Sequence, residues 1–127
     1  MRVHGNGAVR GIAVVAALTL LLGVARFAEG HAILKESSPA ANATVTGPDI
    51  PIHLKFNSRV DAMRSKIQLL RPDNSVMDLS LEKQTAPDTL TSKATGLAAG
   101  EYKIQWQVLA PDGHITRGIV PFTVKGA

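Results

Sequence analysis

Residues 101–109 carry the clearest pattern in this chain, a regular alternation of polar and apolar side chains. The apolar members occupy every second position: Tyr102, Ile104, Trp106 and Val108. Because successive side chains of a strand point to opposite faces, the pattern predicts a β-strand with one buried face. Trp106 and Tyr102 are therefore predicted to be core residues rather than a platform on which a ligand stacks.

Six further short segments favour strands, and turn-forming Pro, Gly, Asn and Asp separate them. The predicted strands cover residues 32–37, 50–56, 66–70, 75–81, 89–93, 101–109 and 118–124, with loops at 57–65 and 82–88. Beyond residue 31 we find no long apolar pattern at helical spacing. About seven strands in roughly 100 residues predict an all-β domain, a Greek-key sandwich or barrel. Pro121 lacks an N–H group, which predicts that the last strand lies at a sheet edge or is bulged.

The first 30 residues are predicted to be a cleaved signal peptide. Residues 1–10 contain two Arg and no acid, and an apolar run at 11–24 follows. Ala28 and Gly30 are the small residues that a signal peptidase requires, so cleavage is expected after Gly30. Cleavage after Ala25 also satisfies the small-residue rule. An uncleaved anchor is disfavoured because the run is shorter than the roughly 20 residues of a spanning helix.

Removal of residues 1–30 leaves one predicted domain, residues 31–127. It takes away three Arg and one Glu, which lowers the formal net charge from +4 to +2. A charge this small, with acids and bases interspersed, gives no case for nucleic-acid binding. The chain has no Cys, which excludes a blue-copper site, a Cys-ligated zinc site and an iron–sulfur cluster.

Three residues are candidate metal ligands: His31, Asp112 and His114. As the first residue after cleavage, His31 would offer one ion both its α-amine and its imidazole Nδ1. Asp112 and His114 are two positions apart, so in an extended segment they project to the same side. Asp-Gly is also an ordinary turn dipeptide, so this pair alone is a weak signal. Together the three residues form a nitrogen and oxygen donor set that suits Cu(II).

Other residues capable of chemistry have simpler interpretations. His53 lies on the outward face of a predicted strand and is interpreted as a surface residue. Met63 and Met77 are too far apart in sequence to predict a thioether cluster for Cu(I), and packing is the expected role of both. The sequence has no nucleophile elbow or other local catalytic signature, so no catalytic residue and no enzymatic activity are predicted.

The mature sequence resembles the CopC family of copper-resistance proteins. The resemblance rests on His31-Ala32, Ser37–Ala40, Ile52–Phe56, Gly100–Trp106, Asp112–His114 and Gly118–Val124. It implies a cupredoxin-like or immunoglobulin-like β-domain in the periplasm that binds one Cu(II) ion through His31, Asp112 and His114. Some relatives have a second, Met-rich Cu(I) site, which this sequence lacks. Asn57-Ser58 stand where some relatives have a Glu, which leaves a fourth protein ligand open.

The favoured hypothesis is a monomeric periplasmic carrier or buffer that passes Cu(II) to a membrane copper transporter of the CopD type. One alternative is a copper monooxygenase with a histidine brace, formed by a terminal His and a second imidazole. Asp112 would then occupy coordination space that an oxygen-activating copper keeps open. Another alternative is a metal-free interaction module, since a β-sandwich does not by itself fix a function.

Overall fold

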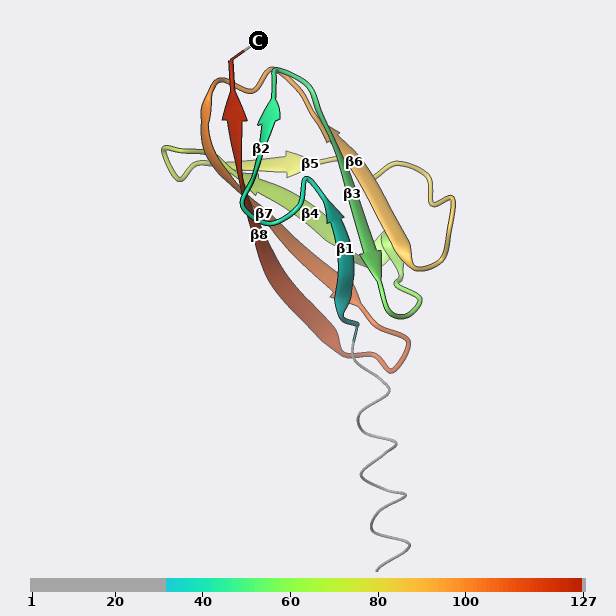
Figure 1. Ribbon diagram of the computed structural model, residues 1–127. Coiled ribbons are helices and arrows are strands. Elements are labelled where there is room, and N and C mark those ends of the chain that lie inside the picture. Colours follow the sequence, from blue (N-terminus) through green and yellow to red (C-terminus); the bar gives the residue numbers. More distant parts are fainter. Residues whose placement is uncertain (1–31, 127) are drawn as a thin grey trace, which may run out of the picture. The chain divides into compact units, whose positions relative to one another are not determined.

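The computed structural model describes residues 32–126, which form two β-sheets (Figure 1). Its elements are β1 (Leu34–Ser38), β2 (Ala43–Thr46), β3 (Ile50–Phe56), the 3-10 helix η1 (Ala62–Arg64), β4 (Lys66–Leu70), β5 (Val76–Leu79), β6 (Thr89–Ala94), β7 (Gly100–Leu109) and β8 (Ile115–Lys125). One sheet has the order β1-β3-β6 and the other the order β2-β8-β7-β4-β5. Within residues 32–126, no helix has the length and apolar content needed to cross a membrane.

The predicted all-β class is confirmed, and the architecture is a β-sandwich; the described strands form no closed barrel. Each of the seven predicted strands corresponds to a strand of the structure. The prediction missed β2, which has only four residues, none of them fully buried. This strand pairs in parallel with β8, from Ala43 opposite Phe122 to Thr46 opposite Lys125.

The hydrophobic core lies between the two sheets and is built from the alternating residues of their strands. Phe56 of β3 and Trp106 of β7 meet across the core edge to face, with ring centroids 5.1 Å apart. Tyr102 stacks on Phe122 and donates its hydroxyl hydrogen bond to the Ala98 carbonyl at 2.7 Å. Tyr102 and Trp106 are 4% and 7% exposed, which confirms them as core residues.

The longest pairing in the fold is the antiparallel hairpin of β7 and β8. Its register runs without a shift from Gly100 opposite Val124 to Leu109 opposite Ile115, and it places Trp106 opposite Gly118. A Cβ atom at Gly118 would lie 2.2 Å from Cζ2 of Trp106. The indole therefore occupies the space that any other residue at position 118 would need.

Pro121 sits at the point where β8 gains its second neighbour. The uninterrupted register shows that the predicted bulge is wrong. The predicted edge position is wrong for residues 122–125, because they lie between β7 and β2. The residues of β8 before Phe122 have no partner in β2. The Pro121 carbonyl accepts a hydrogen bond from the Asn42 N–H, just before β2 begins. The N–H that Pro121 lacks would point to this same side, where the β2 ladder has not yet started.

We predict that Gly118→Ala lowers the free energy of unfolding by about 1–3 kcal/mol, because the added methyl group overpacks against Trp106. Urea unfolding followed by circular dichroism measures the change. Gly126→Ala is the matched control, since nothing lies within 4 Å of its added Cβ. Equal effects of the two substitutions would contradict the packing argument.

Candidate metal centre

The turn between β7 and β8 carries two of the three predicted ligands. The Ala110 N–H donates to the His114 carbonyl at 2.9 Å, and the Gly113 N–H donates to the Ala110 carbonyl at 3.0 Å. Gly113 has a φ of +85°, a left-handed conformation that glycine adopts without strain. This geometry is a three-residue hairpin loop closed by a glycine. The strand predicted at 101–109 thus ends where expected, but β8 begins at Ile115 and not at Gly118.

Asp112 and His114 lie against each other within this turn. Asp112 Oδ1 accepts a hydrogen bond from the His114 backbone N–H at 3.0 Å. The other carboxylate oxygen, Oδ2, lies 2.7 Å from His114 Nδ1. Their side chains are 30% and 65% exposed, so the turn keeps both out of the core. The carboxylate and the imidazole are close together as predicted, but a tight turn brings them together and the extended segment expected from the sequence is absent at residues 111–113.

The separation of these two side-chain atoms is compatible with binding of a metal ion. Bonds of about 2.0–2.2 Å to imidazole nitrogen and carboxylate oxygen, set at a right angle, place the two donor atoms about 2.9 Å apart. The observed 2.7 Å is close to that separation. Alternatively, the carboxylate can hold the Nδ1 hydrogen and leave Nε2 as the ligand, a common arrangement of metal-binding histidines.

His31 and the predicted signal peptide lie outside the described residues. The chain that follows His31 is anchored by Asn57, just after β3. Asn57 Oδ1 accepts a hydrogen bond from the Ile33 N–H at 2.8 Å, and the Asn57 N–H donates to the Ile33 carbonyl at 2.9 Å. The Asp61 N–H, in the same loop, donates to the Leu109 carbonyl at 3.1 Å. The start of β1, the loop after β3 and the β7–β8 turn consequently lie at one end of the sandwich (Figure 1).

Within the described residues, no group of three or more His, Asp or Glu side chains is clustered closely enough to hold a metal ion. His53 is exposed on β3, which confirms its interpretation as a surface residue. Met77 is half-buried against the core, as predicted. The packing prediction for Met63 is wrong, because this residue lies on η1 and is 97% exposed.

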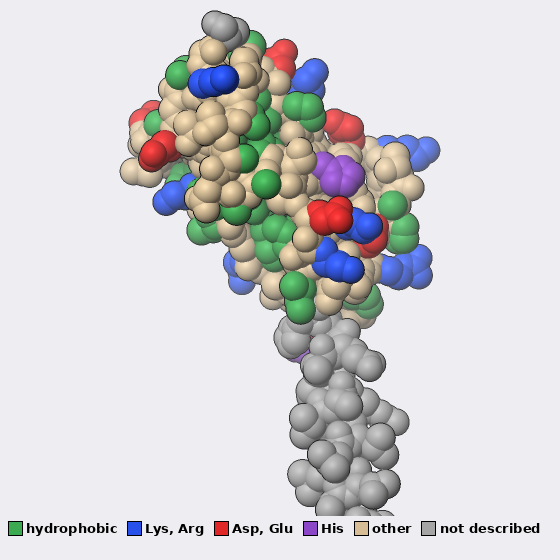
Figure 2. All heavy atoms as spheres, in the orientation of Figure 1, with side chains coloured by type: hydrophobic (Ala, Val, Ile, Leu, Met, Phe, Trp, Pro, Cys, Tyr) green, Lys and Arg blue, Asp and Glu red, His purple; other side chains and the backbone are tan. Residues whose placement is uncertain are grey.

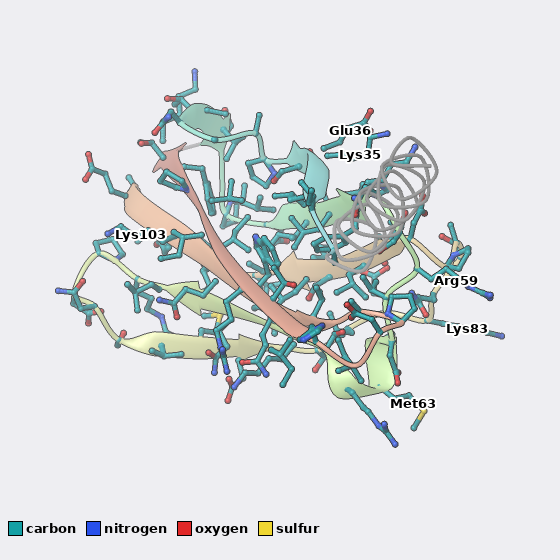
Figure 3. All side chains as sticks on the ribbon, turned by 90° about the horizontal axis from the view of Figure 1, so that it is seen from below. Lys35, Glu36, Arg59, Met63, Lys83 and Lys103 are labelled. Carbon is teal, nitrogen blue, oxygen red and sulfur yellow. The ribbon has the colours of Figure 1, made fainter. Side chains whose placement is uncertain are left out.

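The surface around this end of the molecule combines apolar residues with side chains of both charges. A hollow of about 480 Å³ lies beside the turn, lined by residues 59–61 and 64 of the loop after β3 and by residues 109–111 and 113. Figure 3 shows the side chains of Arg59, Met63 and Lys83 projecting away from the ribbon. Basic and acidic side chains are interspersed over the face seen in Figure 2.

Comparison with known proteins identifies the family of this chain. Residues 34–125 match the family model of the CopC domain. The chain belongs to the CopC family. YobA of Escherichia coli strain K12 is 33% identical over 98 residues, which cover 75% of this chain and 79% of YobA.

Two solved structures of other proteins are similar to this fold. CopC from Methylosinus trichosporium OB3b has a TM-score of 0.70 and 32% sequence identity, covering 76% of this chain and 95% of that protein. PcoC of Escherichia coli, described as a methionine-rich copper resistance protein, has a TM-score of 0.62 and 28% identity, covering 75% of this chain and 99% of PcoC. Their likeness confirms the family that the sequence resembled.

The anchoring role of Asn57 is the feature of this region that the sequence did not predict. An Asn directly after a strand is ordinary turn chemistry, and nothing in the sequence links it to Ile33, which lies 24 positions away. The link passes through one side-chain oxygen and the backbone, so only the fold reveals it.

We predict that Asn57→Ala lowers the free energy of unfolding by about 0.5–1.5 kcal/mol, because the Ile33 N–H loses its acceptor. The same change should speed hydrogen exchange at the Ile33 amide. Ser58→Ala serves as the control, since the Ser58 hydroxyl makes only an exposed 3.4 Å contact with the carbonyl of its neighbour Arg59. If the two variants exchange equally fast at Ile33, Asn57 does not anchor β1.

Proposed function

We propose that this chain is a periplasmic Cu(II)-binding protein that buffers copper or carries it to a membrane partner. Membership of the CopC family and the similarity to a copper resistance protein support a copper-related role. The observation that carries the proposal is the pairing of Asp112 Oδ2 with His114 Nδ1 at 2.7 Å in the β7–β8 turn. These are the oxygen and nitrogen donors that Cu(II) accepts.

His31 completes the proposed ligand set. Cleavage after Gly30 frees its α-amine, which together with Nδ1 closes a chelate ring on one ion. His31 is two residues before Ile33, and two residues of chain span at most about 7 Å. The Asn57 anchor on Ile33 therefore limits how far the first residue can move from this end of the sandwich. With Asp112 and His114, the site would hold one Cu(II) ion per chain.

The proposed donor set would favour Cu(II) over Cu(I). It offers nitrogen and oxygen, whereas Cu(I) prefers thiolate and thioether ligands. The chain has no Cys. Met63 and Met77 are far apart in sequence, and Met63 is exposed on η1 whereas Met77 packs against the core. Reduction of the ion would weaken its binding and favour release to a membrane transporter of the CopD type. The protein would act as a monomer in this role.

The proposal assigns no enzymatic activity to the site. With Asp112, His114 and the two nitrogens of His31 as ligands, the equatorial positions of a Cu(II) ion are filled. A histidine-brace monooxygenase instead keeps such a position open for oxygen. The carboxylate beside His114 thus favours holding copper over activating oxygen with it.

We predict that the protein beginning at His31 binds one Cu(II) ion. His114→Gln or Asp112→Asn should weaken this binding by about tenfold to a hundredfold. Competition titration with a chelator measures the affinity. Paramagnetic resonance of the wild type should show three nitrogen ligands, and His114→Gln should lower that number to two. His53→Gln is the control for loss of an exposed histidine. An equal loss of affinity in that variant would refute the assignment.

A second prediction tests the processed N-terminus. Protein produced with one extra Gly before His31 should bind Cu(II) more weakly, because the amine would no longer belong to the residue that carries the imidazole. The same titration measures the difference, and intact mass of the exported protein reports which residue is first. Unchanged affinity in the extended protein would remove His31 from the proposed ligand set.

A further inference from the structure

The first half of β8 is an open sheet edge. On the side away from β7, β2 pairs only with residues 122–125 of β8. Residues 115–120 have no strand on that side among those the structure describes. Most natural sheets cover, bulge or charge such an edge, because its unpaired N–H and C=O groups can bind another strand.

The register identifies which backbone groups face the open side. The Pro121 carbonyl accepts from Asn42 on the β2 side, and alternate residues of a strand direct their backbone groups to the same side. Ile115, Arg117 and Ile119 therefore present their N–H and C=O groups to the open edge. In residues 32–126 we find no hydrogen bond to these groups. The intervening residues of β8 bond to β7.

The side chains of these three residues form a distinct pattern along the edge. Ile115 and Ile119 are 51% and 58% exposed, and Arg117 lies between them on the same outward face. Arg117 Nε donates to Gln107 Oε1 at 2.9 Å, which holds the guanidinium over the sheet. The edge thus offers two apolar side chains that flank one cation.

A hollow in the outer face of the sheet adjoins this edge. It has a volume of about 420 Å³, and its lining residues are Lys66, Gln68, Gln105, Trp106, Gln107, Arg117, Gly118 and Ile119. The lining includes two cations and no acidic residue. An acidic side chain held beside Arg117 would meet complementary charge there.

We propose that the β8 edge at Ile115–Ile119 binds an extended segment of another protein by strand addition. The segment would alternate apolar, acidic and apolar side chains, with the acid facing Arg117 and the apolar groups facing Ile115 and Ile119. Main-chain hydrogen bonds supply affinity in this mode, and the alternate side chains supply specificity. Five residues of paired strand span about 16 Å.

Charge argues against a second copy of this chain as the occupant. Antiparallel self-pairing centred on this edge would place Arg117 directly opposite Arg117 of the second copy. Like charges at directly opposed positions destabilise a strand pair. The same arginine therefore disfavours self-association and favours an acidic partner.

The edge begins one residue after His114, so a bound segment would lie next to the proposed copper turn. Strand addition itself requires no metal, and it is tested on the copper-free protein. The inference can therefore fail or succeed separately from the copper proposal. His114→Gln should bind the segment as the wild type does.

The test uses the capped peptide Thr-Val-Thr-Glu-Thr-Val-Thr, which presents the proposed pattern in either strand direction. The control peptide has Lys in place of Glu. We expect binding of the Glu peptide to slow hydrogen exchange at the amides of Ile115, Arg117 and Ile119 and to leave those of Thr116, Gly118 and Val120 unchanged. The Glu peptide should bind at least about fivefold more tightly than the Lys peptide.

Two protein variants sharpen the result. Arg117→Glu should reverse the order of the two peptides. Ile119→Pro removes an N–H that β7 does not use, so it should abolish binding of both peptides while the circular dichroism spectrum stays unchanged. Pro121 lies two residues after Ile119, and it shows that β8 accepts proline where the backbone groups face away from β7.

Several outcomes would overturn the proposal. One is the absence of amide protection at millimolar Glu peptide, and another is protection that maps to a different strand. Equal binding of both peptides would remove Arg117 as the selecting residue. Concentration-dependent dimers in sedimentation, with the same three amides protected, would make a second copy the occupant.

Discussion

The register of the β7–β8 hairpin is the constraint on which the rest of the structure depends. The three-residue turn at 111–113 sets this register, and nine further residue pairs extend it from Leu109–Ile115 to Gly100–Val124. A slip of one residue would turn every inward side chain of β8 to solvent. The Trp106–Gly118 pair opposes such a slip, because the indole fits only against a residue without a Cβ. This alignment determines which side chains of β8 enter the core and which of its backbone groups face the open edge.

The sequence predicted the strands whose apolar side chains alternate clearly, and β3 and β7 are the best examples. It missed β2 because Ala43–Thr46 is short and half-exposed. Its position is decided by parallel pairing with a segment nearly 80 residues away. The start of β8 was misplaced for a different reason. Gly118 suggests a strand boundary by sequence, whereas in the fold it is the spacer that accommodates Trp106 within a continuous strand.

Some contacts of the candidate site could likewise be predicted from the sequence, and others could not. The two-residue spacing of Asp112 and His114 was enough to predict their proximity, although the contact arises in a short turn and not in the extended segment that was expected. The anchor from Asn57 to Ile33 and the bond from Asp61 to Leu109 could not be predicted, since they join segments far apart in sequence through one side-chain oxygen and backbone groups. The role of His31 stays a prediction, because it depends on cleavage after Gly30 and His31 lies outside the described residues.

The almost complete exposure of Met63 has a consequence for chemical damage. Methionine oxidation converts an apolar thioether into a polar sulfoxide, and this disrupts proteins chiefly where the side chain is packed. Met63 makes no contribution to the core, whereas Met77 packs against it. Oxidation of Met63 would therefore leave the packing of the core unchanged, whereas oxidation of Met77 would place a polar group against it.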